Sequence, residues 1–253
     1  YSLCLGAITA IDAPSPLEWL VVALDDTSGF AYTREQASTA GADALWVESV
    51  GDVRLGGAIT LTHGQIEIDS AGNSEDVSLT GTVLTGWFTY LTAGGSIGSE
   101  ARPITVAAED EGLYALGAVA GGDVWLAMYA TYHSATATGG LLSLDDPTTG
   151  GDCDLAYLGD YREIAPGTWE AIGTTLQLVG LAQAGGNFSL TTQGSGALKV
   201  YSPVSAGDSV ALLATNADAF IQLHQSVTAA NLVEVSAGLG VGGGSSTLLT
   251  AHD

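Results

Sequence analysis

Apolar and polar residues alternate along most of this chain in short runs, each bounded by Gly, Asn, Asp or Ser. This period of two is typical of a strand with one face buried and the other in water. Each run is too short to bury itself alone, so we expect many short strands stacked against one another. The clearest runs span residues 58–62, 65–69, 141–144, 175–178, 188–191, 197–200 and 220–223.

A short motif, Gly-Asp-Val-x-Leu, recurs among these runs. It stands at 51–55 and 122–126, and in altered form at 76–79, 151–155 and 207–212. The intervals between its aspartates are close to one or two multiples of roughly 23 to 29 residues, the range of stacked repeat architectures. The motif therefore predicts equivalent positions in successive coils of a solenoid.

Four side chains test this register directly. If the motif copies are equivalent, Val53, Val77 and Val124 occupy the same place in different coils and all point into one core. Cys153 takes the same inward position, where a free cysteine packs as a small apolar side chain. A disulfide between Cys4 and Cys153 would join distant coils, so we expect none.

Two all-β architectures compete for this pattern: antiparallel sandwiches or barrels, and parallel β-helices. Hairpin-rich sandwiches favour two-residue Asn-Gly or Asp-Gly turns, and neither dipeptide occurs in the chain. We therefore predict an all-β fold, a right-handed parallel β-helix (β-solenoid), in which each coil contacts only its neighbours. Residues 1–253 are expected to form a single β-solenoid segment of a longer polypeptide.

The regularity of the pattern divides the chain into four parts. Residues 1–43 are less regular and are expected to complete a preceding coil, with a short helix over 33–44. Residues 44–144 and 174–253 carry the repeats. Residues 145–173 break the rhythm and predict a loop or small insertion that projects from the rod. Such excursions often carry the function of a repeat scaffold.

The charge of the chain excludes one class of partner. Five basic residues stand against 28 acidic ones, for a formal net charge of −23. Nucleic-acid binding depends on Lys and Arg displacing counterions from phosphates, so we expect no nucleic-acid partner. No run approaches the roughly 20 apolar residues of a membrane span. Self-repulsion of this size calls for screening by salt or divalent cations, which favours an extracellular or cell-surface location.

Acidic residues gather around one Gly-rich turn. Asp145, Asp146, Asp152 and Asp154 lie within a few positions of one another. Calcium prefers several carboxylate and carbonyl oxygens on a flexible loop, so these four are the candidate metal ligands and calcium the candidate ion. The alternative is that they are ordinary solvated acids at a corner of the coil.

The same segment raises an enzymatic alternative, because parallel β-helices also serve as polysaccharide lyases and hydrolases. Such enzymes place carboxylates and a cation in a groove on one sheet face. The same four aspartates are the candidate catalytic carboxylates, with Asp160 and Glu163 nearby. Only Arg162 and Lys199 stand where a cation could assist. We therefore expect no enzyme, with a polysaccharide lyase or hydrolase as the alternative.

Aromatic residues raise a second alternative, a surface-layer or glycan-binding module. Trp87, Tyr90, Trp125 and Tyr132 belong to neighbouring repeats and would form a ladder of rings if their strands shared one exposed face. Rings stacked along a solenoid are more often internal, and surface glycans are the candidate partner for rings that are exposed.

Residues 95–126 carry a resemblance to a known family. The unit Ser-Ile-Gly-Ser at 96–99, followed by Arg-Pro-Ile at 102–104, a Leu-x-Ala strand and Gly-Gly-Asp-Val-Trp-Leu at 121–126, resembles repeats of filamentous-haemagglutinin-like bacterial adhesins. The resemblance is clearest over 44–130 and looser over 174–250. It implies a non-enzymatic extracellular filament or cell-surface adhesin, which works in adhesion, matrix or cell-to-cell contact. The plain alternating strands at both ends predict self-association, head to tail or with further repeats.

Overall fold

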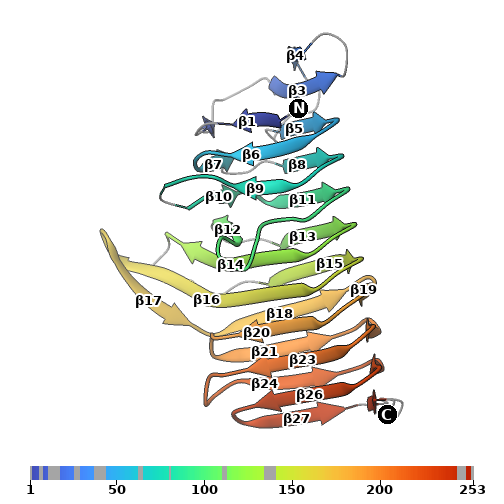
Figure 1. Cartoon of the computed structure of the whole chain (residues 1–253). Helices are drawn as coiled ribbons and strands as arrows, with labels where there is room; N and C mark the ends of the chain where they lie inside the picture. Colours follow the sequence, from blue (N-terminus) through green and yellow to red (C-terminus); the bar gives the residue numbers. More distant parts are fainter. Residues whose placement is uncertain are drawn as a thin grey trace.

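The computed structural model describes residues 2–5, 8–10, 18–25, 29–36, 44–61, 65–79, 81–109, 113–133, 141–243 and 249–251. These residues form a parallel-stranded β-solenoid of about 8 turns (Figure 1). The described part of the chain contains no helix, and therefore none long and apolar enough to cross a membrane. The predicted all-β solenoid is confirmed. Its right-handed winding stays a prediction, based on the strong preference of parallel crossovers for that hand.

One face of the solenoid is built from two parallel sheets that lie end to end. The smaller sheet has the order β1 (Ser2–Leu5), β6 (Asp52–Leu55) and β9 (Ser74–Asp76). The larger sheet has the order β2 (Ile8–Ala10), β7 (Ile59–Leu61), β10 (Val83–Thr85), β12 (Ile104–Glu109), β14 (Val124–Tyr132), β16 (Cys153–Ala165), β20 (Phe188–Thr192), β23 (Ser209–Ala214) and β26 (Leu232–Ala237).

The opposite side of each coil belongs to a single long sheet. Its main path runs β27 (Gly240–Gly243), β24 (Phe220–Leu223), β21 (Gly196–Val200), β18 (Thr174–Val179), β15 (Leu141–Thr149), β13 (Leu113–Ala120), β11 (Phe88–Ala93), β8 (Gln65–Ser70), β5 (Ala44–Ser49), β3 (Glu18–Asp25) and β4 (Gly29–Gln36). From β15 onward the later coils add a short strand each: β19 (Ala182–Ala184), β22 (Val204–Ala206), β25 (Val227–Ala229) and β28 (Leu249–Ala251).

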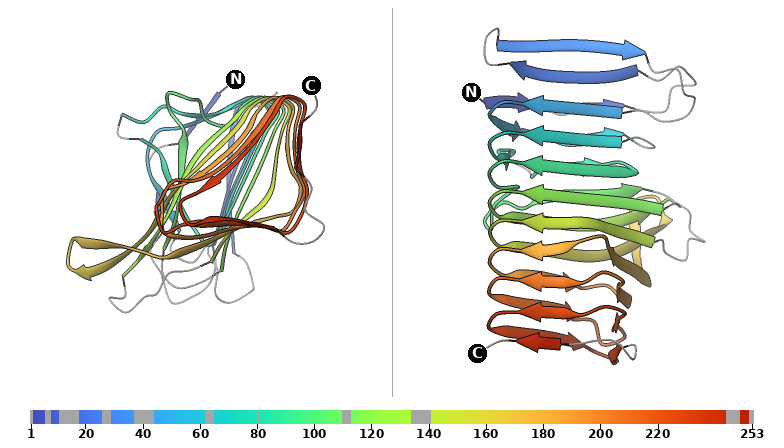
Figure 2. Two further views of the ribbon diagram at one scale, coloured as in Figure 1. Left: turned by 90° about the horizontal axis from the view of Figure 1, so that it is seen from below. Right: turned by 90° about the vertical axis from the view of Figure 1, so that its right-hand side faces the viewer.

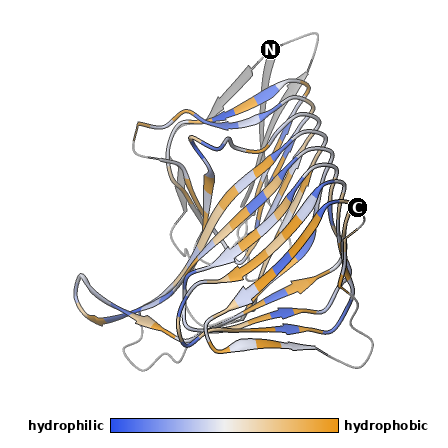
Figure 3. Cartoon of the chain, turned by 60° about the horizontal axis from the view of Figure 1, so that its bottom comes forward, coloured by the Kyte–Doolittle hydropathy of each residue, from blue (hydrophilic) through white to orange (hydrophobic). Residues whose placement is uncertain are grey.

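The core fills the interior of the coil because alternate residues of each strand point inward. In β14 buried and partly exposed residues alternate without a break, and Figure 3 shows the same alternation of hydropathy along the strands. Strand pairing aligns equivalent inward residues into columns parallel to the axis. One column contains Val53, Ser74, Ile97, Val124, Cys153, Phe188 and Val210, all of them buried.

Cys153 therefore packs as predicted, between Val124 and Phe188, and it is a free thiol. Burial raises the pKa of this thiol well above its ordinary value, so the side chain stays neutral and apolar. Cys4 lies on β1, and strands β6, β9 and β14 separate that strand from β16 (Figure 1). The two cysteines are several strand spacings apart, too far for a disulfide.

The predicted register is right for Val53 and Val124 but wrong for Val77. Strand β9 pairs with β6 so that Val53 lies against Ser74, and Val77 is 39% exposed. The motif copy at 76–79 is displaced because its aspartate, Asp76, is an inward residue beneath Leu55 and not a corner residue. Leu79, which the motif placed inside, is fully exposed.

The described strands of the first part of the chain pair with the coil that follows, and the prediction that residues 1–43 complete a preceding coil stays a prediction. Strand β1 stacks on β6, β2 stacks on β7, and β3 pairs in parallel with β5. The predicted helix over 33–44 is wrong where the structure describes it. Residues 33–36 belong to β4, which pairs antiparallel with β3, and residues 37–43 lie outside the described residues. Strand pairing outweighs the local helix propensity of this segment.

The predicted excursion over 145–173 is narrower than expected. Residues 145–157 remain in the coil, within β15, the corner that follows it and the start of β16. The projecting part is an antiparallel hairpin between β16 and β17 (Thr168–Ile172), which runs from Asp160 to Ile172. We call it the hairpin arm, and Figure 2 shows it leaving the stack of coils.

Candidate functional site

Each coil turns from the long sheet to the opposite face at a corner that carries a polar side chain. In successive coils this position is Asp52, Asn73, Ser96, Asp123, Asp152 and Asn187. The side-chain oxygen of each residue accepts a hydrogen bond from the backbone N–H of the next, at 2.9, 2.8, 3.0, 2.9 and 2.7 Å in turn. We call this row the corner ladder.

The corner ladder defines the true length of the coils. Successive members are separated by 21 residues at the shortest and 35 at the longest. The longest coil is the one that contains the hairpin arm. Later in the chain Asn231 donates its side-chain amide to Asp208, so the same kind of contact continues toward the last described coils.

Glycines precede the ladder residues because the coils approach one another closely there. A Cβ at Gly94, Gly121, Gly150, Gly185 or Gly207 would lie 2.0 to 2.3 Å from the carbonyl oxygen of the coil before it. No Cβ tolerates such a contact with backbone, so a side chain at these positions would force two coils apart. The Gly-Gly-Asp pattern in the sequence therefore records coil stacking.

The smaller sheet is interrupted after β9. In the next coil only Ile97 bridges to Ser74 and to Val124. At Gly98, whose φ is +67°, the chain leaves the sheet and makes a turn between Ser99 and Arg102. It returns to the larger sheet in β12, where Ile104 pairs with Leu126. A stretch of strand is thus missing between β9 and β14.

The missing stretch leaves a depression of about 420 Å³ on the surface. We call it the acidic groove. Its walls come from the two flanking strands and from the corner ladder. The residues that line it are Asn73, Glu75, Asp76, Ser96, Gly98, Ser99, Asp123 and Trp125.

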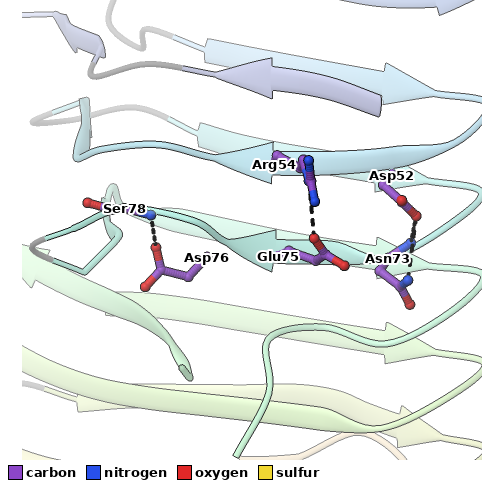
Figure 4. Close-up of polar contacts among 6 residues, drawn as sticks. All are labelled: Asp52, Arg54, Asn73, Glu75, Asp76 and Ser78. Atoms are coloured by element: carbon purple, nitrogen blue, oxygen red, sulfur yellow. Dashed lines mark hydrogen bonds and ion pairs between the residues drawn. The ribbon is translucent and has the colours of Figure 1, made fainter. Parts of the chain in front are cut away.

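Most polar side chains of the acidic groove are held in place by neighbours. Figure 4 shows three of these contacts on β6 and β9. Asn73 donates to Asp52 through its backbone, and Glu75 accepts from Arg54 Nε at 3.3 Å. Asp76 is 9% exposed and accepts hydrogen bonds from the backbone N–H of Ser78 at 2.8 Å and from the hydroxyl of Thr82 at 2.7 Å.

The carboxylates predicted to bind calcium are placed in different surroundings. Asp152 belongs to the corner ladder, and Asp154 follows it on the outward side of β16. Asp145 and Asp146 lie in a bend of β15, where Asp146 accepts from the backbone N–H of Leu181. The described residues contain no group of three or more His, Cys, Asp or Glu side chains able to hold a metal ion.

This distribution has a structural reason. Asp145 and Asp146 belong to the long sheet, whereas Asp152 and Asp154 lie beyond the corner, where each strand continues on a different face. Proximity in the sequence does not bring side chains together across such a corner. The structure therefore does not bring the four carboxylates into one site, and calcium binding stays a prediction.

Of the residues considered for catalysis, Asp160, Arg162 and Glu163 lie at the hairpin arm and are engaged there. Asp160 is buried at its root and accepts hydrogen bonds from the hydroxyls of Tyr132, at 3.4 Å, and Tyr157. Arg162 forms an ion pair with Glu170 across the arm, at 2.7 Å. These contacts fix the direction of the arm. Lys199 lies on β21 of the long sheet, whereas the arm belongs to the opposite sheet.

A second contact ties the arm to the coil. Nδ1 of His133, at the end of β14, lies 3.1 Å from Oε2 of Glu163, and the His133 ring meets the Trp169 ring edge to face at 5.5 Å. Glu163 also accepts from the backbone N–H of Gly167 at 2.6 Å. The Gly167 N–H, followed by His133, lowers the pKa of the Glu163 carboxyl below its ordinary value.

The predicted aromatic ladder does not form on one face. Tyr90 lies on β11 of the long sheet, with Trp87 just before that strand and packed against the core. Trp125 and Tyr132 both lie on β14, but Tyr132 is buried while Trp125 lines the acidic groove. Of the four rings, only Trp125 contributes to this depression.

Sequence reasoning missed Glu75, Asp76 and Asp123 as members of a site. A signal was present, since Gly98 and Pro103 stand where the next two coils have the uninterrupted strands β14 and β16. A chain that leaves a sheet for a few residues exposes the strands on both sides. Comparison with known protein families, with curated proteins and with solved structures yields no match, so the chain is assigned here to its architecture, a β-solenoid.

Proposed function

We propose that this chain is a non-enzymatic structural segment of a large extracellular bacterial filament or adhesin, which mediates adhesion, matrix or cell-to-cell contact through display and self-association. The observation that carries the proposal is the corner ladder with its glycines. In coil after coil, residues at these positions serve contact with the next coil. A chain organised in this way builds an axially continuous rod.

The last described coils supply the surface for self-association. Val241 on β27 pairs with Ile221, a fully buried inward residue, yet Val241 itself is 45% exposed. Leu232 and Leu249 are 55% and 50% exposed in the same region. A further coil, from the same polypeptide or from a second copy, would cover these side chains and pair with the open strand edges.

Sedimentation at increasing protein concentration, combined with electron microscopy, tests this proposal. We expect end-to-end assemblies that lengthen with concentration. Val241→Asp should abolish them without lowering the melting temperature, because it places a charge on the surface that must become buried. Leu79→Asp, at a fully exposed position in an inner coil, is the matched control and should assemble normally.

Two results would contradict the proposal. One is a strictly monomeric chain at all concentrations; the other is assembly that survives Val241→Asp unchanged. The display role needs a separate measurement, in which beads coated with the chain are tested for adhesion to cells or matrix. Coated beads that adhere no better than beads coated with an unrelated acidic protein would count against it.

A further inference from the structure

We propose that the acidic groove binds a saccharide that is neutral or carries an amino group. The groove lies where the strand is interrupted after Ile97. The proposal does not rest on the structural role above. The groove volume of about 420 Å³ lies in the range of pockets for small ligands.

Trp125 provides the apolar element that a sugar ring requires. The ring carbons of a pyranose present C–H groups on one face, and these pack against an indole. Trp125 is only partly buried, while its neighbours Val124 and Leu126 are anchored in the core. The backbone of β14 thus holds the indole at the wall of the groove. Little conformational entropy is therefore lost when a ligand binds.

The polar lining provides fixed hydrogen-bond partners for the sugar hydroxyls. Asn73, Ser96 and Asp123 belong to the corner ladder, so their positions are set by contacts with neighbouring coils. In the ladder Asp123 accepts through Oδ1, so Oδ2 can accept from a ligand. Hydroxyl and carboxylate groups around one aromatic ring match the alternation of hydroxyls and C–H faces in a saccharide.

The charge of the groove selects among saccharides. Glu75, Asp76 and Asp123 line it, and of the cations nearby Arg54 is paired with Glu75 and Arg102 donates to the Ser78 carbonyl. The net charge of −23 adds a repulsive field around the whole molecule. An acidic saccharide is therefore disfavoured. A protonated amino group is attracted by these carboxylates and donates hydrogen bonds to them.

Isothermal titration of the full chain with three oligosaccharides tests the proposal. The probes are a glucosamine tetramer, an N-acetylglucosamine tetramer and a galacturonate tetramer. We expect binding of the first two, tightest for the glucosamine tetramer, and none for the third. Trp125→Ala should weaken binding by about tenfold or more. Trp169→Ala, which removes an indole from the hairpin arm, is the matched control and should leave binding unchanged.

Two further variants keep the test decisive if Trp125→Ala lowers stability. Asp123→Asn retains the Oδ1 acceptor of the ladder while removing the charge, so it should reduce the preference for the amino sugar over its N-acetyl form. Glu75→Lys, at a partly exposed position, should weaken the amino sugar and admit the galacturonate tetramer.

Three outcomes would overturn the proposal. The first is equal binding of all three sugars, and the second is sugar binding that none of these substitutions changes. The third is the absence of binding for all three sugars. A lysine-rich peptide that then binds in a manner that requires Trp125 would assign the groove to a basic polypeptide partner.

Discussion

Removal of one corner-ladder side chain tests how much the ladder stabilises the solenoid. Asp152 is the best position because its carboxylate accepts two hydrogen bonds from Asn187, one from the backbone N–H at 2.7 Å and one from the side-chain amide at 3.1 Å. Asp152→Ala removes the single oxygen, Oδ1, that accepts both hydrogen bonds. Asp152→Asn retains an oxygen at the Oδ1 position and removes only the charge.

The expected magnitude follows from the exposure of this corner. A hydrogen bond to a charged acceptor contributes about 1.5 kcal/mol, and the longer amide contact about 0.5 kcal/mol, because water can replace it. Asp152→Ala should therefore destabilise the local structure by about 2 kcal/mol, and Asp152→Asn by about 0.5 kcal/mol or less. Asp154→Ala, on the outward side of the same strand and outside the ladder, should have little effect.

Hydrogen exchange is the appropriate assay because unfolding of a repeat array need not be two-state. A local loss of about 2 kcal/mol makes the Asn187 amide exchange about thirtyfold faster, while amides several coils away keep their rates. If that amide stays equally protected in Asp152→Ala, or if the Ala and Asn variants behave alike, the ladder is not a stabilising element.

Three further predictions concern the core, the corner and the arm. Val124→Asp should lower the free energy of unfolding by about 3 kcal/mol or more through an unpaired buried carboxylate, whereas Val77→Asp should change it by less than about 0.5 kcal/mol; urea denaturation showing equal losses would disprove the register. Gly121→Ala should lower the free energy of unfolding by about 1 to 3 kcal/mol, because the new Cβ would lie 2.3 Å from a backbone oxygen. Gly242→Ala should be tolerated, because its Cβ would have no atom within 4 Å. Equal melting temperatures for the two variants would refute the steric argument. The folded-state pKa of Glu163 is lowered, so the contribution of this carboxylate to stability is present above the unfolded pKa of about 4.3 and is lost as the pH falls through the folded pKa. An NMR titration of the arm should show this transition in the native chain, and the transition should be absent in Glu163→Gln.

The sequence by itself determined the architecture of this protein. Alternation with a period of two, corners of Gly and Asp, and recurrence of the same motif predict a parallel solenoid, and Cys153 was placed correctly in its core. These features are readable because each one recurs in the sequence. The side-chain alternation follows from the strand pleat, and glycine recurs wherever the backbones of successive coils approach closely.

Only the tertiary structure decided the register of individual coils and the position of the acidic groove. Whether Ser74 or Val77 lies inward depends on which residue pairs with Val53 in the preceding coil, and two similar motif copies cannot settle that. The strand β4 and the hairpin arm likewise depend on pairing partners distant from any local pattern. The groove exists because a strand is missing from one coil, and its acids come together only through stacking of residues that lie far apart in the sequence.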